Sequence, residues 1–160
     1  MDFFIVLSFF DRKIGPLIFD SYPIINIEDE LADAISSIMD HLLTEGFVTY
    51  SFGKFFLFNY HFEINSSWAR GRKESLLLSV IFDERVEIET EKVILTLCIE
   101  FSEWLKNQEE IFKGFYFKDV TYYKEEKNRK VIDNNSSIIR SWVEEFYKAI
   151  SDVIQEKIVK

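Results

Sequence analysis

The sequence predicts an α/β protein of the α+β kind, in which one small antiparallel sheet packs with three helices in a single domain, residues 1–160. Two runs, 3–10 and 76–82, are apolar at odd and even positions alike, which is typical of central strands covered on both faces. Three other segments repeat apolar residues at helical spacing. A chain of 160 residues with only 2 Pro suits one domain with short connections.

The chain opens with a predicted hairpin whose first strand is 3–10. The second strand, 17–22, follows a polar turn; Pro16 precedes it, Asp20 lies within it and Pro23 follows it. Proline has no amide donor for a neighbouring strand. The second strand is therefore predicted to lie at an edge of the sheet.

The first helix is predicted to begin at Asn26, whose side chain can accept a hydrogen bond from a backbone amide of the first turn. Three acidic residues come soon after it and oppose the positive end of the helix dipole. Gly46 is predicted to close the helix in a left-handed conformation. The residues that recur at helical spacing are Leu31, Ile35, Ile38, Met39 and Leu42.

Three strands and a second helix are predicted next. Residues 48–52 alternate apolar with small polar side chains, 55–64 carry an aromatic face, and 76–82 complete the sheet. From Thr90 the apolar residues follow helical spacing for long enough to outweigh the β-branched residues among them. Gly114 is the predicted end of this helix.

The segment before the last helix has a mixed pattern. Residues 115–123 are rich in aromatic side chains and are predicted to be extended and ordered against the body, whereas the charged run 124–130 is predicted to be solvated. The aromatic side chains can cap the core or offer an apolar patch to a partner. The last helix is predicted to begin at a cap formed by Asn135, Ser136 or Ser137.

The charge and the single cysteine exclude several classes of function. The net charge of −9, from 28 acidic and 19 basic residues, repels a phosphate backbone, so nucleic acid is not an expected partner. Cys98 has no second cysteine for an internal disulfide, which suits a reducing compartment. The N-terminal apolar run is too short to span a membrane and follows Asp2. We expect a cytoplasmic protein with at most peripheral membrane contact.

No catalytic, cofactor or metal site is predicted. Cys98 lies on the apolar stripe of the second helix, where a cysteine is usually inert core. His41 and His61 lie in no known catalytic or metal-binding signature, and two histidines with one cysteine make a poor metal site. Nucleotide-binding and nucleophile motifs are also absent from the sequence.

A basic cluster lies between the last two strands: Trp68, Arg70, Arg72 and Lys73. One interpretation is a solvated surface loop, because connections between strands are commonly charged. The other is a docking site for an acidic partner or an anionic lipid, with Trp68 as anchor and the arginines gripping carboxylate or phosphate.

The order of elements resembles the longin domain of the SNARE-like superfamily. The resemblance rests on FFIVLSFF as first strand, DRKIGPLIFDSYP through the hairpin turn and second strand, and two helices after LLLSVIF. The segment WARGRKE is similar to one in archaeal longin-like proteins. The resemblance covers essentially the whole chain and implies a five-stranded antiparallel sheet in the order 2-1-5-4-3, with one helix on one face and two on the other. The long segment 115–135 departs from this pattern.

Longin-like domains serve as interaction platforms in membrane-trafficking complexes and as regulators of small GTPases, and they offer no catalytic residues to transfer. The resemblance therefore implies a non-catalytic protein-interaction module whose partner is a trafficking or GTPase component, or a second copy. In the implied order the third strand is an edge without Lys or Pro, so Val48, Thr49 and Tyr50 are predicted to contact a partner, with a homodimer as one outcome. The alternative is that 115–123 cover this edge.

Two other function classes compete with this prediction. A PAS-like small-molecule sensor shares the strand order and could enclose a ligand beneath its aromatic strands, but only one helix fits between the second and third strands here. A hydrolase or transferase would need an acid, base or nucleophile in a recognisable arrangement. We expect the chain not to be an enzyme.

Overall fold

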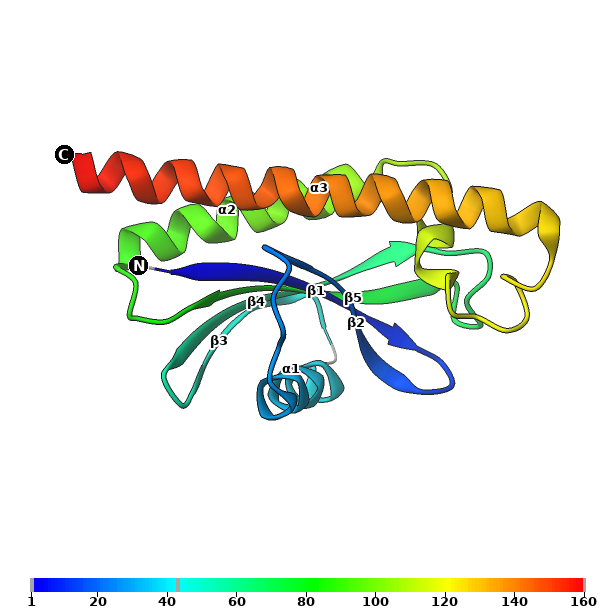
Figure 1. Cartoon of the computed structure of the whole chain (residues 1–160), viewed down its shortest axis with the longest axis horizontal. Coiled ribbons are helices and arrows are strands. Elements are labelled where there is room, and N and C mark those ends of the chain that lie inside the picture. Colours follow the sequence, from blue (N-terminus) through cyan, green and yellow to red (C-terminus); the bar gives the residue numbers. More distant parts are fainter. Residues whose placement is uncertain (1, 43, 160) are drawn as a thin grey trace.

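The computed structural model describes residues 2–42 and 44–159. Its elements follow the predicted order, with one short 3-10 helix added before the last helix (Figure 1). They are β1 Phe3–Asp11, β2 Gly15–Tyr22, α1 Asp29–His41, β3 Gly46–Phe52, β4 Phe55–Asn65, β5 Lys73–Phe82, α2 Ile88–Lys106, η1 Ile111–Tyr116 and α3 Glu126–Val159.

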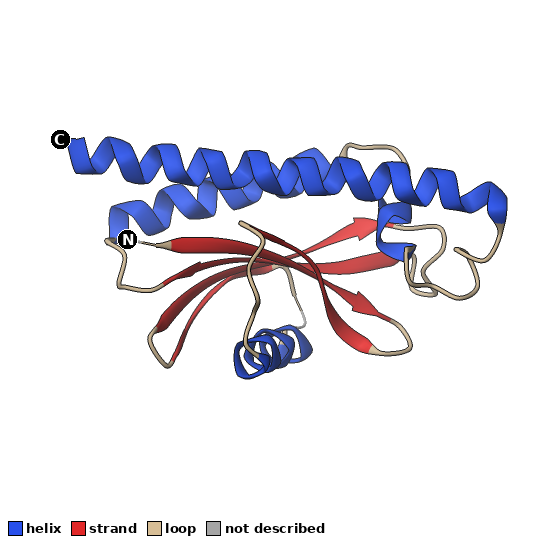
Figure 2. Ribbon diagram, in the orientation of Figure 1, coloured by secondary structure: helices blue, strands red, loops and turns tan. Residues whose placement is uncertain are grey.

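The strands form one antiparallel sheet in the order β2-β1-β5-β4-β3, which confirms the predicted order. Figure 2 shows α1 on one face of this sheet and α2 and α3 on the other, in the predicted layers. The strands β1 and β5 lie in the middle because both are apolar on both faces and have to be covered twice.

Alternate residues of the central strands enter two separate cores. Leu77 packs on the α1 side together with Leu31 and Ile35, whereas its neighbour Leu78 packs on the side of α2 and α3. The second core is larger and is built mainly from rings. Its buried aromatic residues are Phe9, Phe19, Phe58, Phe62, Phe82, Phe101, Phe112, Phe115, Tyr116 and Phe146.

The ends of α1 differ from the prediction. The helix begins at Asp29 with Glu28 at the cap position, and the Glu28 carbonyl accepts a 3.0 Å hydrogen bond from the Ala32 amide. Asn26 lies outside the helix. Gly46 does not close the helix but begins β3, where it pairs with His61 of β4. The pairing of β3 along its whole length explains this difference, because Gly46 is drawn into the sheet.

Gly114 does not end α2, which stops at Lys106, but lies within η1. At Gly114 the backbone of η1 touches α3. A Cβ atom there would stand 2.7 Å from Cδ1 of Ile139 and 2.8 Å from backbone atoms of Asn135 and Ser136. The glycine thus allows two helices to pack closely. Glycine is used both at helix ends and at such close contacts, so the sequence alone does not distinguish the two roles.

The last helix begins at Glu126, so the predicted caps Asn135, Ser136 and Ser137 lie inside it. Asn135 has a polar partner there, because its Nδ2 donates a 2.9 Å hydrogen bond to the Glu110 carbonyl just before η1. Two of these three polar residues, Asn135 and Ser136, are therefore part of the contact surface of α3 for η1, whereas Ser137 is exposed. The charged run 124–130 forms the entry and first turn of the helix, and all of it except Asn128 is exposed, in agreement with the predicted solvated run.

The aromatic segment 115–123 is ordered against the body as predicted, but it is not extended: it consists of the last two residues of η1 and the turns that follow them. The ring of Phe115 lies 4.9 Å from that of Phe19, and Phe117 lies 5.5 Å from Phe19. Tyr122 stacks on Trp68. Part of this segment therefore caps the core at the end of the sheet where β1 meets β2.

We expect truncation of the sheet core to destabilise the fold strongly. Phe58→Ala and Leu78→Ala remove buried side chains, and each should lower the free energy of unfolding by about 2–5 kcal/mol. The control Glu87→Ala, an exposed position, should change it by less than about 0.5 kcal/mol. Urea titrations followed by circular dichroism measure all three; an unchanged midpoint in both core variants would contradict the assigned burial.

Candidate functional site

The strand β3 forms one edge of the sheet and carries the predicted contact residues Val48, Thr49 and Tyr50. It pairs with β4 in an unbroken register, with Thr49 opposite Phe58 and Tyr50 opposite Leu57. Thr49 therefore faces the α2 and α3 layer and Tyr50 faces the α1 side. The Tyr50 side chain is 50% exposed, so the edge presents an aromatic ring to solvent.

The opposite edge, β2, is protected by several devices. Pro16 removes a backbone donor, and the pairing register of β1 with β2 shifts between Leu7 and Ser8. Asp20 adds a charge that Arg140 of α3 contacts at 3.1 Å. Such devices discourage pairing with another chain. None of them occurs in β3, which has no Pro, no charge and no register shift.

The segment 115–123 does not cover β3. Its aromatic rings lie against Phe9 of β1, Phe19 of β2 and Trp68 of the loop between β4 and β5. The alternative in which this segment covers the β3 edge is therefore wrong. A hollow of about 330 Å³ instead follows β3 on the α2 side, where Thr49 and Ile88 are among its lining residues. Ile88 is 66% exposed.

In the predicted basic cluster, the Trp68 ring is held by the chain's own aromatic residues. It stacks on Tyr122 at 4.1 Å between ring centroids and meets Phe112 and Tyr116 edge to face. The ammonium group of Lys113 lies 5.1 Å from its ring centroid. Trp68 thus attaches the loop to η1, and its exposed neighbours carry the charge of the cluster.

Those neighbours are Arg70, Arg72 and Lys73, all exposed. Arg72 has a left-handed backbone with φ of 64°. Its amide donates to the Ala69 carbonyl and its carbonyl accepts from the Ser66 amide, both at 3.0 Å. The tight turn that results presents all three basic side chains to solvent.

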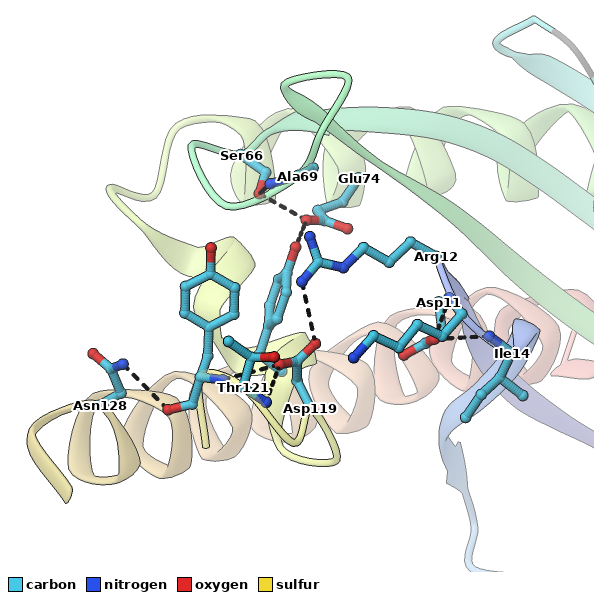
Figure 3. A network of polar contacts seen from close by, with 12 residues as sticks. Asp11, Arg12, Ile14, Ser66, Ala69, Glu74, Asp119, Thr121 and Asn128 are labelled. Carbon is cyan, nitrogen blue, oxygen red and sulfur yellow. Dashed lines mark hydrogen bonds and ion pairs between the residues drawn. The ribbon is translucent and has the colours of Figure 1, made fainter. Parts of the chain in front are cut away.

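Beneath this turn lies Glu74 of β5, which is only 7% exposed (Figure 3). Its Oε1 accepts a hydrogen bond from the hydroxyl of Ser66 at 2.7 Å and another from the hydroxyl of Tyr116. Ser66 Oγ also accepts from the Ala69 amide at 3.2 Å. One buried carboxylate thereby joins the sheet, the turn and η1.

A second buried carboxylate, Asp119, faces the same region and is 8% exposed. Its Oδ1 accepts from the amides of Thr121 and Tyr122, both at 2.9 Å. Its Oδ2 lies 3.8 Å from Nη2 of Arg12, which comes from the turn between β1 and β2. Figure 3 shows the Arg12 guanidinium between Glu74 and Asp119.

These groups surround a hollow of about 170 Å³, with Phe9 and Phe115 among its apolar walls and Arg70 and Lys73 at its rim. Of its polar residues, sequence reasoning identified Arg70 and Lys73 but missed Arg12, Glu74, Tyr116 and Asp119. One signal was available: Glu74 is a carboxylate two residues before the apolar run 76–82.

Burial raises the pKa of Glu74 above its ordinary value, although hydrogen bonds from Tyr116 and Ser66 and the charge of Arg12 oppose this shift. Burial also raises the pKa of Tyr116, and the hydrogen bond to Glu74 adds to that rise. The pair therefore holds the phenol neutral while the carboxylate is costly to ionise.

The candidates for chemistry are not brought together. His41 lies on α1 and Cys98 on α2, on opposite faces of the sheet. His61 is buried, with Nδ1 at 2.8 Å from the Thr44 carbonyl and Nε2 at 2.6 Å from the hydroxyl of Ser75. Within 2–42 and 44–159, no three His, Cys, Asp or Glu side chains are placed to hold a metal ion.

Comparisons with protein-family models and with curated proteins find no match for this chain. The longin-like resemblance consequently stays a prediction. In the described part of the chain, each helix is too short or too polar to cross a membrane.

We expect the Cys98 thiol to be unreactive in the folded protein. The side chain is fully buried, and burial raises its pKa, so little thiolate forms at neutral pH. A chromogenic disulfide reagent should label Cys98 in denaturant but not in native buffer. Rapid labelling of the native protein would contradict this placement.

Glu74→Gln should stabilise the protein at neutral pH. The pKa of Glu74 is higher in the folded protein than in the unfolded chain. Ionisation of Glu74 therefore lowers the free energy of unfolding as the pH rises from the unfolded pKa through the folded pKa. Glutamine keeps an acceptor oxygen for both hydroxyls and carries no charge. The gain over wild type should be present at pH 7.5 and vanish near pH 4.

Urea unfolding of both proteins across this pH range tests the expectation. Glu87→Gln is the matched control, since it removes an exposed carboxylate and should show no such trend. If Glu74→Gln were instead less stable at pH 7.5, by a margin that shrinks on acidification, the ionised carboxylate would be stabilising through Arg12.

Proposed function

We propose that the chain is a non-catalytic, cytoplasmic protein-interaction module of the longin-like type, acting in a membrane-trafficking complex or in small-GTPase regulation. Its docking site is the β3 edge. The observation that carries this proposal is the contrast between the two edges of one sheet, since β2 carries Pro16, a charge and a register shift while β3 carries none.

The β3 edge offers a partner both backbone groups and a place for side chains. When a partner adds a strand to a sheet edge, main-chain hydrogen bonds provide the affinity. Pockets that accept every second side chain of the partner provide the specificity. The hollow along β3 lies on the α2 side, where Phe56, Phe58 and Ile88 line it. A strand added at β3 would place every second side chain on the face of the sheet that carries this hollow.

We assign the edge to β3 of a second copy. The strand spans 7 residues and has no charged side chain, so antiparallel pairing with itself sets no like charges opposite each other. Centred on Thr49, this pairing sets Val48 opposite Tyr50 and Thr49 opposite its counterpart. An aromatic residue beside a β-branched one, and two threonines, are both favourable cross-strand pairs.

The same pairing brings Phe47 of the second copy opposite Ser51, on the α2 side. Ser51 lines the hollow along β3, so the incoming ring would lie over that hollow. The net charge of −9 on each copy opposes association. Because salt screens this repulsion between exposed charges, the dimer should strengthen as the ionic strength rises.

Light scattering from micromolar to millimolar concentration tests the dimer. Wild type should dimerise, more so at high salt, and both Thr49→Pro and Thr49→Lys should be monomeric, because one removes a backbone donor and the other adds a charge at the edge. Thr96→Lys, the same change at an exposed position on α2, is the matched control and should dimerise like wild type.

Circular dichroism establishes that each variant is folded, and Thr49→Lys keeps the test valid if Thr49→Pro disrupts β3. A wild type that stays monomeric at every concentration would overturn the second copy as occupant. A dimer that neither Thr49 variant weakens would place the interface outside β3.

A further inference from the structure

We propose that the hollow beside Glu74 binds a small zwitterion carrying an ammonium and a carboxylate group, of the size of a free aliphatic amino acid. This role goes beyond protein interaction at β3 and does not depend on it, because the hollow lies between β1, β5 and η1. It would give the chain the small-molecule function that the sequence left as the alternative.

The floor of the hollow is a built polar site. Glu74 and Asp119 are both more than nine-tenths buried, and each is held by hydrogen bonds from the surrounding chain. Arg12 is the cation among them, so two carboxylates and one guanidinium leave excess negative charge on the floor. Excess buried charge is costly unless a counter-charge meets it. An ammonium group entering the hollow would supply that counter-charge.

The rim has the opposite net sign, because the two cations Arg70 and Lys73 outnumber the carboxylate of Asp11. Arg70 and Lys73 line the mouth and are exposed. The carboxylate of Asp11, which also lines the hollow, accepts hydrogen bonds from the amides of Lys13 and Ile14 at 2.8 and 3.0 Å, in its own turn. A ligand carboxylate at the rim would therefore meet an arginine and a lysine, which bind carboxylates by charge-assisted hydrogen bonds.

The walls and the volume set the rest of the ligand. The rings of Phe9 and Phe115, with centroids 5.6 Å apart, both line the hollow. Its volume of about 170 Å³ is close to that of an engineered cavity that holds benzene, about 150 Å³. Apolar walls with a few placed polar groups are typical of small-molecule sites. A whole amino acid with a branched aliphatic side chain has about the size of this space.

Ligands with only one charge fit less well. A simple carboxylate would bind the cations of the rim but would lie close to the buried carboxylates of Glu74 and Asp119 on the floor. A simple amine would bind the carboxylates of the floor but would lie close to the cations of the rim, Arg70 and Lys73. The arrangement of negative floor and positive rim therefore favours a molecule with both charges.

Isothermal titration calorimetry of the full chain tests the proposal by measuring the affinity for three matched probes. L-Valine carries both groups, isobutylamine is valine without the carboxylate, and 3-methylbutanoate is valine without the amine. We expect L-valine to bind at least about tenfold more tightly than either, since each charged group adds hydrogen bonds worth more than about 1.4 kcal/mol.

Variants separate the two ends of the ligand. The double variant Arg70→Gln/Lys73→Gln should bind valine only as tightly as isobutylamine. Its affinity for isobutylamine should not be lower than that of wild type. Glu74→Gln should weaken both valine and isobutylamine. The matched control is Arg72→Gln, which removes an exposed charge from the same turn but does not line this hollow, and it should bind valine like wild type.

Thermal melts establish that each variant is folded. Equal affinity for valine and 3-methylbutanoate, no binding of any probe, or an equal loss in Arg72→Gln would each overturn the proposal. Thr49→Lys should bind valine normally, so failure of the dimer and failure of the ligand site are distinguishable.

Discussion

The pairing of β1 with β5 is the interaction on which the other layers depend. The two strands meet residue by residue from Phe3 opposite Phe82 to Phe9 opposite Leu76, and almost all of their side chains are buried. Because both strands are apolar on both faces, neither face can remain in water. One side recruits α1 and the other recruits α2 and α3, and β2 and β4 extend the sheet outward from this pair.

This dependence explains why the architecture could be predicted from the sequence and the helix ends could not. Apolar residues on both faces identify a central strand wherever it occurs, and alternation or helical spacing identifies the elements around it. Gly114 and Asn135 carried the local signals of a helix end and a helix start. In the structure they form one contact between η1 and α3, and nothing in the local sequence distinguishes a polar or small residue used for packing from one used for capping.

The two candidate sites were accessible to sequence reasoning to different degrees. The β3 edge follows from strand order and composition, so its residues could be named in advance. The hollow beside Glu74 brings Arg12 together with Tyr116 and Asp119, which lie far from it in the sequence. Only the packing of η1 against the end of the sheet brings them together, and the sequence contains no motif that records this. The basic turn could be identified from the sequence, but the buried carboxylates of Glu74 and Asp119 beneath it could not.

An open edge also has a consequence for the protein in a crowded cell. The strand β3 is 7 residues long, uncharged and free of proline, which are the properties of segments that stack into cross-β fibrils. A sheet with one such edge unpaired is a standing template for aggregation. Pairing of β3 with the same strand of a second copy would then act as a safeguard, and copies that remain monomeric would be the ones most exposed to fibril growth.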